Sequence, residues 1–238
     1  MKHPSQTLRV HQIFHSIDGE YNGYGGAGEL ATFIRLSGCN LRCAWCDTKY
    51  AQEGTTKSRN IASIVKRIRP QTKITITGGE PLLQPCGLVD LVARLRRKDC
   101  KISIETNGSL RIPEDIHHND MVRFIVDFKL KSSGMSEHMV WNSYPFTQLK
   151  HGDVVKFVIA NIEEYQDALY VVDRLRSRFT SWKEAAPTMV FSPAIDNQYV
   201  YTCWPAELAK KMISDAVDGI QYSLQIHKVL WPYSTKER

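Results

Sequence analysis

Short runs of β-branched and aromatic residues alternate along the chain with longer segments whose apolar residues recur at helical spacing. The runs that predict buried strands are residues 31–36, 73–77, 101–105, 122–127, 154–159, 188–191 and 221–226. The apolar stripes that predict helices are Ile61, Ile64, Val65 and Ile68, then Leu88, Leu91, Val92 and Leu95, then Ala168, Val171, Val172 and Leu175, and finally residues 207–217. Repeated strand–helix–strand units predict an α/β protein with parallel strands joined by helical crossovers.

The number of these units decides between two closures of the sheet, a doubly wound open sheet and all or part of a β/α barrel. A full eight-unit barrel typically needs about 250 residues. The 238-residue chain supplies about six or seven units, some with short or missing helices. We therefore predict a partial, open and abbreviated β/α barrel that forms a single domain over residues 1–238. In either closure, ligands gather beyond the carboxyl ends of the strands.

Composition and charge are those of an ordinary globular protein. Hydrophobic residues make up 42% and charged residues 24%, which excludes a disordered or fibrous chain. The mean hydropathy of −0.32 predicts no membrane span, and residues 1–7 lack the apolar core of a signal peptide, so we expect a cytoplasmic protein. The densest basic run within the net charge of +6, residues 94–98, closes a predicted helix, where cations complement the helix dipole. A nucleic-acid or other anionic partner is the alternative reading of this run.

Three of the six cysteines, Cys39, Cys43 and Cys46, fall within eight residues at the spacing Cys-x3-Cys-x2-Cys. In a chain without a secreted disulfide framework, such a cluster indicates metal or redox chemistry. Three thiolates suit an iron–sulfur cluster with one iron left open, whereas structural zinc would need a fourth close ligand. A catalytic zinc and a structural coincidence are the remaining alternatives. The isolated cysteines, which we expect to be small buried apolar residues, are Cys86, Cys100 and Cys203.

The cysteine spacing, with Trp45 directly before the last cysteine, resembles the signature of the radical S-adenosylmethionine superfamily. The resemblance implies a [4Fe-4S] cluster whose fourth iron binds the amino and carboxylate groups of S-adenosylmethionine. The reduced cluster then cleaves the sulfonium to methionine and a 5′-deoxyadenosyl radical, so the cofactor carries the hard chemistry. Residues 77–81, with paired glycines that allow close backbone approach, and residues 105–108 follow in superfamily order. Taken alone, each of these two motifs is typical of an ordinary turn.

A narrower resemblance rests on residues 13–20, 33–39 and 46–48, which are similar to the 7-carboxy-7-deazaguanine synthase family. The later segments that resemble this family are residues 127–129, 192–193 and 225–228. The resemblance implies a pared-down β/α barrel, in line with the count of units. It also implies the conversion of 6-carboxy-5,6,7,8-tetrahydropterin to 7-carboxy-7-deazaguanine with loss of ammonia, a step toward queuosine and other deazapurines. Magnesium is required in that family, and S-adenosylmethionine is regenerated.

The same resemblance implies roles for individual residues. The cluster ligands would be Cys39, Cys43 and Cys46, and the magnesium ligand would be Thr48. The residues expected at the pterin are Ile17, Asp18, Gly19, Arg35, Thr77 and His227. The residues expected at S-adenosylmethionine are Trp45, Cys46, Asp47, Gly79, Asp127, Phe128, Lys129 and Ser192. The cluster loop, residues 38–48, is expected to be compact, and the family gives little guidance on the tail, residues 229–238.

Four of these residues also have a physical interpretation of their own. Arg35, at the end of a buried strand, can fork onto the substrate carboxylate or pair with a nearby acid. Thr48 offers a hard oxygen for Mg²⁺, or it begins a helix together with Asp47. Asp18 stands where the family more often has glutamine, and an ionised carboxylate only accepts hydrogen bonds. His227, near the end of the last predicted strand, reaches the pterin or is a core histidine.

Two other functions remain open on the sequence. One is a glycyl-radical-enzyme activase of the same superfamily, which abstracts hydrogen from a glycine of a partner protein; residues 17–20 and the Asp47-Thr48 pair argue against it. The other is a zinc-stapled RNA-binding module, whose binding would fall steeply with salt. For the synthase we expect a small-molecule pterin substrate, an electron donor such as flavodoxin and, by resemblance alone, a homodimer. No direct nucleic-acid contact and no membrane contact are expected.

Overall fold

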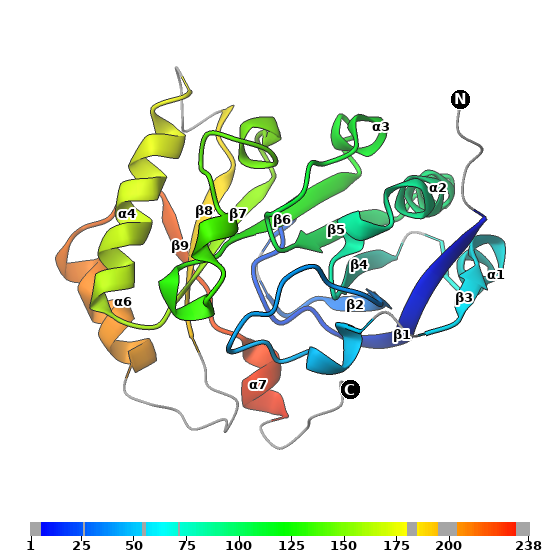
Figure 1. The fold of residues 1–238 in the computed structure, drawn as a ribbon, viewed down its shortest axis with the longest axis horizontal. Helices are drawn as coiled ribbons and strands as arrows, with labels where there is room; N and C mark the ends of the chain where they lie inside the picture. Colours follow the sequence, from blue (N-terminus) through cyan, green and yellow to red (C-terminus); the bar gives the residue numbers. More distant parts are fainter. Residues whose placement is uncertain are drawn as a thin grey trace.

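The computed structural model describes residues 6–25, 27–53, 56–70, 72–179, 185–194 and 204–231, and these build one nine-stranded sheet with helices packed along it (Figure 1). The order of the strands across the sheet is β3-β1-β2-β4-β5-β6-β7-β8-β9. The strands are β1 Thr7–Ile17, β2 Leu30–Leu36, β3 Ser58–Asn60, β4 Lys73–Gly78, β5 Lys101–Thr106, β6 Val122–Phe128, β7 Val154–Ile159, β8 Thr188–Pro193 and β9 Ile220–Tyr222. The α-helices are α1 Ile61–Lys66, α2 Pro85–Arg96, α3 Glu114–His117, α4 Ile162–Arg176, α6 Trp204–Ser214 and α7 Ile226–Leu230. The short 3₁₀ helices are η1 Lys49–Ala51, η2 Pro81–Leu83, η3 Lys131–Ser133, η4 Ser136–His138 and η5 Phe146–Gln148.

The direction of the strands defines the architecture. Strands β2 and β4 to β9 run parallel to one another, while at one edge β1 pairs antiparallel with both β2 and β3. The edge strands of the described sheet, β3 and β9, do not pair with each other. Figure 1 shows α1, α2 and α3 beside one half of the sheet and α4 and α6 beside the other half. The sheet is therefore an open, partial β/α barrel, which confirms the predicted fold class.

Alternation along each strand separates an outer face under the helices from an inner face. On β4, Ile74 and Ile76 are fully buried and belong to the same core as the apolar stripe of α2. Burial of each such side chain contributes about 1.5–3 kcal/mol to folding. The residues between them, Lys73, Thr75 and Thr77, face inward, where they meet a buried carboxylate and a cavity. The inner face is thus where the polar side chains of this sheet gather.

The connection between β1 and β2 crosses the amino-terminal ends of the central strands. Ser103 Oγ on β5 donates to Asn22 O at 3.1 Å, and Tyr24 Oη donates to Ile102 O at 3.4 Å. Tyr21, from the same connection, packs on inner-face side chains of three neighbouring strands. Those side chains are Ile125, Val154 and Val190. The base of the barrel is therefore filled, and its open space lies toward the carboxyl ends of the strands.

The structure corrects some predicted element boundaries. Strands β1 and β3 were missed, because β1 mixes polar and apolar residues and is half-buried over most of its length. The last predicted strand, residues 221–226, is wrong in extent, since β9 ends at Tyr222. Ile226 N donates to Gly19 O at 2.9 Å, so the chain leaves the sheet here and begins α7. His227 consequently lies in a helix and not at the end of a strand.

The remaining predictions about single segments have mixed outcomes. Helix α6 ends at Ser214, earlier than predicted, and Ala216 with φ 48° cannot continue a helix. Cys100 is buried as predicted, but Cys86 is exposed, because it begins α2 on the side away from the apolar stripe. Cys203 lies outside the described residues, as does the tail from residue 232 onward.

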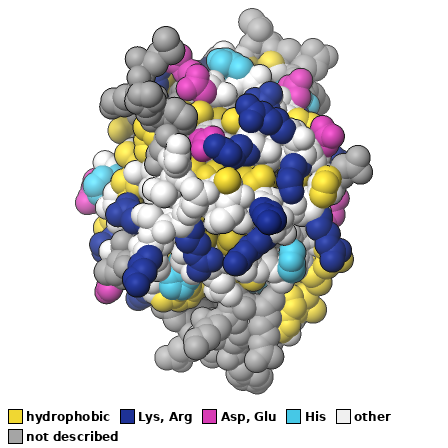
Figure 2. Space-filling model, turned by 90° about the vertical axis from the view of Figure 1, so that its right-hand side faces the viewer, with side chains coloured by type: hydrophobic (Ala, Val, Ile, Leu, Met, Phe, Trp, Pro, Cys, Tyr) yellow, Lys and Arg dark blue, Asp and Glu magenta, His cyan; other side chains and the backbone are white. Residues whose placement is uncertain are grey.

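The basic run at residues 94–98 is the end of a helix, as predicted. Helix α2 stops at Arg96, and Lys98 Nζ donates to Val65 O at 2.9 Å and to Ile68 O at 2.5 Å. These carbonyls lie at the end of α1, so the cation satisfies helix-terminal acceptors there. Within the described part of the chain, no helix has both the length and the apolar character needed to cross a membrane. Figure 2 shows further Lys and Arg side chains spread over the face on the α1–α2 side of the molecule.

Candidate active site

A cavity of about 260 Å³ lies toward the carboxyl ends of the parallel strands. Strands β2, β4, β5, β6 and β7 contribute to its walls, together with the segment after β2 that carries the cysteine cluster and with α7. The predicted site residues that line it are Ile17, Asp18, Gly19, Arg35, Cys39, Cys43, Trp45, Cys46, Asp47, Thr48, Thr77, Gly79, Asp127, Lys129 and His227. Residues that are far apart in the sequence thus share one space, as the predicted fold class requires.

The cluster loop is closed at its base by backbone hydrogen bonds to η1 and the residue after it. Gly38 N donates to Ala51 O at 2.7 Å, and Cys39 N donates to Gln52 O at 3.0 Å. Gly38 has φ 99°, a conformation that glycine adopts without strain. Leu41 is 1% exposed and anchors the loop in the core. The three cysteines are therefore presented from a fixed, compact loop.

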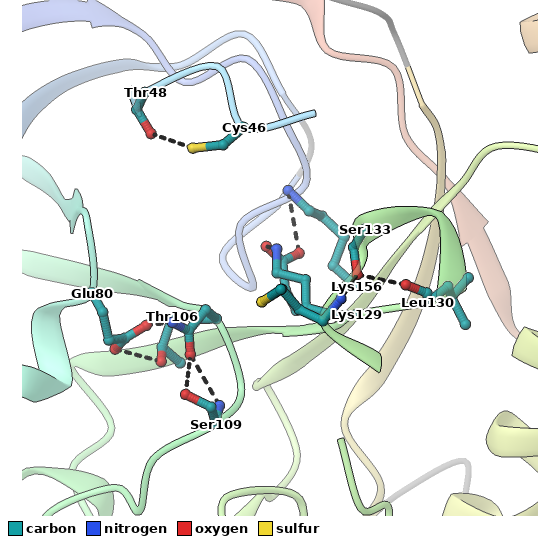
Figure 3. A network of polar contacts seen from close by, with 12 residues as sticks. Cys46, Thr48, Glu80, Thr106, Ser109, Lys129, Leu130, Ser133 and Lys156 are labelled. Atoms are coloured by element: carbon teal, nitrogen blue, oxygen red, sulfur yellow. Dashed lines mark hydrogen bonds and ion pairs between the residues drawn. The ribbon is translucent and has the colours of Figure 1, made fainter. Parts of the chain in front are cut away.

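The turn after β4 is built against this loop. Glu80 N donates to Gly38 O at 2.7 Å, and a Cβ added at Gly79 would collide with Gly38 O. The Glu80 carboxylate accepts from Thr106 Oγ1 and from Asn107 N, both at 2.7 Å, so it joins this turn to the end of β5 (Figure 3). The glycine and the glutamate of the motif at residues 77–81 thus fix the relative positions of the cluster loop, β4 and β5.

The thiols of the cluster loop fit a cationic iron–sulfur group. Burial, with smaller contributions from neighbouring acids and from the other thiols, raises the pKa of Cys39 and Cys43. A bound metal favours the thiolate form that such an environment disfavours. Among the described residues, no three His, Cys, Asp or Glu side chains converge on a single metal ion. A cluster does not need such convergence, because its thiolates bind different irons.

The wall beside the cysteines carries paired charges. Lys129 Nζ is 2.7 Å from Asp127 Oδ2 and lies 5.0 Å from the centre of the Trp45 ring. Asp127 Oδ1 is buried and accepts no hydrogen bond within the described part of the chain. Figure 3 shows Lys129 beside Lys156, with Cys46 and Thr48 across the view, and all four residues line the cavity. An unused acceptor next to the thiols is suited to hydroxyl or ammonium donors of a bound cofactor.

Two predicted cofactor residues do not line the cavity. The Phe128 ring packs in the core, 5.1 Å from the ring of Phe146 and 5.5 Å from that of Phe157, so only its backbone is near the site. Ser192 falls on the inner face of β8 by strand alternation, next to the cavity-lining Ala194. Its Oγ is buried and has no hydrogen-bond partner in the described part of the chain.

The residues predicted to meet the pterin lie on adjoining elements. Arg35 and Thr77 are register partners on β2 and β4, and the Arg35 guanidinium lies 5.9 Å from the centre of the Phe14 ring. Gly19 abuts His227, whose Nδ1 would be 2.5 Å from a Cβ at that position. Burial is the main cause of a lowered pKa of His227.

Thr48 and Asp47 follow the last cysteine and line the cavity near α7. Thr48 Oγ1 lies 3.6 Å from Cys46 Sγ, and it makes no capping hydrogen bond to η1, so the alternative role as a side-chain N-cap is not observed. Asp47 Oδ2 is 3.7 Å from Lys228 Nζ. Burial acts to raise the pKa of Asp47, but the charges of Lys228 and Arg35 outweigh it, and that pKa is lowered. A carboxylate and a hydroxyl that contacts the last cysteine therefore follow each other in the cavity lining.

Lys156 was not singled out from the sequence, and Glu20 and Glu105 appeared there only as members of the motifs at residues 13–20 and 105–108, without a role of their own. Lys156 Nζ lies 2.6 Å from Glu20 Oε2 and 3.6 Å from Asp127 Oδ1, and Gln225 Nε2 donates to Glu20 Oε1 at 2.8 Å. Burial acts to raise the pKa of Glu20, yet the Lys156 charge outweighs it and lowers that pKa to about 2. Glu105 also lines this space. A charged residue within a largely apolar strand, Glu105 in β5 and Lys156 in β7, was the available signal.

Replacing Glu105 by glutamine is expected to remove part of the pH dependence of stability. Burial raises the pKa of Glu105 from 4.5 to about 7, so the folded chain binds this proton more tightly than the unfolded chain. The resulting stabilisation is complete below the unfolded pKa and is lost as the pH rises through about 7, a change of about 2–3 kcal/mol. Urea unfolding of the cofactor-free chain would measure this. Between pH 5 and pH 8, the free energy of unfolding of Glu105→Gln should rise by this amount relative to that of the parent protein.

The same experiment has an internal control. Glu80 also has a pKa raised by burial to about 7, and it is present in both proteins, so the difference between them isolates Glu105. An identical pH dependence in the two proteins would contradict the assignment.

Comparisons with known proteins agree with this geometry. Residues 33–136 match the family model of the Radical SAM superfamily. The structure of QueE from Escherichia coli superposes with a TM-score of 0.65 at 20% identity, covering 92% of this chain and 94% of that chain. Streptococcus suis SuiB bound to S-adenosylmethionine superposes with a TM-score of 0.53 at 11% identity, covering 82% of this chain and 47% of that chain. The fold and the cysteine-lined cavity define a radical S-adenosylmethionine enzyme.

Two curated relatives narrow the class. The 7-carboxy-7-deazaguanine synthase of Clostridium acetobutylicum is 31% identical over 231 residues, which is 94% of this chain and 96% of the relative. That of Koribacter versatilis is 33% identical over 241 residues, which is 96% of this chain and 99% of the relative. The chain belongs to the 7-carboxy-7-deazaguanine synthase family of radical S-adenosylmethionine enzymes, and its cofactors are a [4Fe-4S] cluster, S-adenosylmethionine and Mg²⁺.

Proposed function

We propose that this protein converts 6-carboxy-5,6,7,8-tetrahydropterin to 7-carboxy-7-deazaguanine with loss of ammonia, a step toward queuosine and other deazapurines. The observation that carries the proposal is the similarity to named synthases over nearly the whole chain. It is supported by a single cavity that brings the three clustered cysteines together with the predicted pterin residues. This membership favours the synthase over the activase and over the zinc-stapled RNA-binding module.

On the cofactor side, Cys39, Cys43 and Cys46 would hold the cluster. When bound, the reduced cluster and S-adenosylmethionine supply the 5′-deoxyadenosyl radical that abstracts hydrogen from the substrate. The remaining work of the chain is to bind, orient and exclude water. Gly79 would approach the cofactor through its backbone. The other residues proposed to contact S-adenosylmethionine are Trp45, Asp47, Asp127, Phe128, Lys129 and Ser192, with Phe128 limited to backbone contact because its ring is in the core.

On the substrate side, Arg35 would fork onto the pterin carboxylate from the floor of the cavity. Thr48 would give Mg²⁺ one hard oxygen, and substrate oxygens and waters would complete its six ligands. Thr77, the register partner of Arg35, would contact the ring from the neighbouring strand. The segment 17–19 and His227, which pack on each other at Gly19, would close over the pterin from the opposite side.

As a radical S-adenosylmethionine enzyme, the protein acts on a small molecule and needs an electron donor. A flavodoxin is the donor that we propose, and a homodimer is the proposed assembly, as the family resemblance implies. We further propose that the protein is cytoplasmic, because a reducing compartment preserves the three thiols for cluster assembly. One domain over residues 1–238 remains our proposal for its organisation.

Replacing Arg35 by alanine is expected to weaken substrate binding while sparing the cluster. A charge-assisted hydrogen bond contributes about 1.5–3 kcal/mol, so the KM for the pterin should rise about 10- to 150-fold. Iron content and the slow cleavage of S-adenosylmethionine without substrate should be unchanged. Steady-state kinetics with parallel iron analysis provides the measurement. Arg35→Lys keeps the charge but loses the forked geometry, so its KM should lie between those of the parent and of Arg35→Ala. Unaltered substrate affinity in Arg35→Ala would show that this side chain does not clamp the carboxylate.

The function itself is tested by turnover. The anaerobically reconstituted protein would be incubated with the carboxytetrahydropterin, S-adenosylmethionine, Mg²⁺ and a reductant, and the products analysed by mass spectrometry. We expect 7-carboxy-7-deazaguanine and ammonia, with more than one product formed per S-adenosylmethionine present. Cleavage of S-adenosylmethionine without consumption of the pterin would overturn the proposal and favour a glycyl-radical-enzyme activase instead.

A further inference from the structure

The acidic side chains of the cavity differ in how much of their hydrogen-bonding capacity this chain already uses. Glu20 is engaged on both oxygens, on Oε2 by Lys156 at 2.6 Å and on Oε1 by Gln225 at 2.8 Å. Asp18 is 2% exposed and lines the same cavity. Its side-chain partners contact one oxygen, Oδ2, so Oδ1 can accept from a ligand. Asp18, like Asp127, is therefore a carboxylate of this cavity with an oxygen left to recognise a bound molecule.

Three donors converge on Oδ2 of Asp18. The distances are 2.9 Å from Lys73 Nζ, 3.0 Å from Asn22 Nδ2 and 3.2 Å from Thr75 Oγ1. Lys73 is 9% exposed and begins β4 on its inner face, and its other partner, Glu29, is a largely exposed side chain 2.9 Å away. A buried carboxylate with an ammonium and two further donors on one oxygen is held in one orientation.

The backbone of Asp18 is fixed as well. Its N–H donates to Glu29 O at 2.7 Å, and its carbonyl accepts from Gly28 N at 2.8 Å. The next residue, Gly19, abuts His227 on α7. The main chain at Asp18 is therefore held in place, and the three donors on Oδ2 set the direction of its carboxylate.

We propose that Lys73 is a specificity-determining residue, because its ammonium on Oδ2 fixes the Asp18 carboxylate so that Oδ1 selects ligands presenting N–H donors. The inference deepens the proposed function and rests on it, since a 2-amino-4-oxopterin carries an amino group next to a ring N–H. A ligand with oxygen in place of that amino group sets an acceptor against the carboxylate. Glutamine, the more usual family residue at this position, can donate or accept, whereas a carboxylate can only accept.

The test uses two oxidised probes, 6-carboxypterin and its 2-oxo counterpart 6-carboxylumazine. Their Kd values for the anaerobically reconstituted protein with S-adenosylmethionine bound would be measured by equilibrium dialysis. The parent protein is expected to prefer the amino compound by about tenfold or more. Lys73→Met should bring the two Kd values within about threefold of each other, because an unpaired buried carboxylate takes up a proton and can then donate. Glu29→Gln, which removes only the exposed partner of Lys73, is the matched control and should keep the parent ratio.

A second variant keeps the proposal falsifiable if Lys73→Met does not fold. Lys73→Met/Asp18→Asn leaves no buried charge alone and should fold, binding both probes within about threefold. The parent preference, retained in Lys73→Met or in the double variant, would overturn the role of Lys73. Equal binding of both probes by the parent protein would refute this inference alone, whereas binding of neither probe would contradict the proposed function.

Discussion

Replacing Cys43 by alanine is expected to abolish the iron–sulfur cluster and turnover together. Cys43 lines the cavity between the other two clustered cysteines, and two thiolates cannot hold three irons of a cluster. The chain has no other source for the chemistry that the cofactor supplies, so turnover should fall by at least about a thousandfold. Iron and acid-labile sulfide analysis, the visible absorption spectrum and product formation would be measured on the same preparation.

The matched control for this experiment is Cys86→Ala. Cys86 is exposed at the start of α2 and does not line the cavity. Its replacement should leave iron content, colour and turnover at the parent level. Turnover that survived in Cys43→Ala, with Cys86→Ala also active, would refute the cluster assignment.

Replacing Lys156 by methionine is expected to destabilise the cofactor-free chain by about 3–5 kcal/mol at pH 7, because it leaves the Glu20 carboxylate buried without its cation. In the parent chain the Lys156 charge, working against burial, lowers the pKa of Glu20 from 4.5 to about 2. An acid with a lowered folded-state pKa stabilises above its unfolded pKa, and that contribution, about 3 kcal/mol, disappears as the pH falls from 4.5 to 2. Urea unfolding should therefore show a large penalty for Lys156→Met at pH 7, and this penalty should shrink as the pH falls from 4.5 toward 2.

A double variant separates the ion pair from simple packing. Lys156→Met/Glu20→Gln replaces both charges, so no unpaired carboxylate remains, and most of the lost stability should return. A single variant as stable as the parent at pH 7, or a penalty that does not shrink in acid, would mean that this pair does not stabilise the fold.

The parallel part of the fold was predictable because its signal is local. Strands buried on both faces, such as β4 and β7, appear as continuous apolar runs, and α2 and α4 show their stripes at helical spacing. Strand β1 carried no such signal, because as an antiparallel addition near the sheet edge it is half-buried along most of its length. The predicted end of the last strand was wrong for another reason. Docking of α7 onto Gly19 is a contact between distant segments, which apolar periodicity does not encode.

The same distinction applies to the site. The cysteine loop was predictable because its three thiols are neighbours in the sequence. Lys156 and Glu105 could be seen as isolated charges in apolar strands, yet their importance depends on which strands lie side by side. The partnership of Asp18 with Lys73 joins the end of β1 to the start of β4, and only the folded chain brings them together.

The central claim is that three neighbouring thiolates hold a cluster with one iron open to S-adenosylmethionine. The most direct test is the electron paramagnetic resonance spectrum of the oxygen-protected, reduced protein, recorded with and without S-adenosylmethionine alongside iron and sulfide analysis. The account predicts about four irons and four sulfides per chain and a cluster signal that shifts when S-adenosylmethionine is added. A colourless protein that takes up no iron, or a cluster signal indifferent to S-adenosylmethionine, would contradict it.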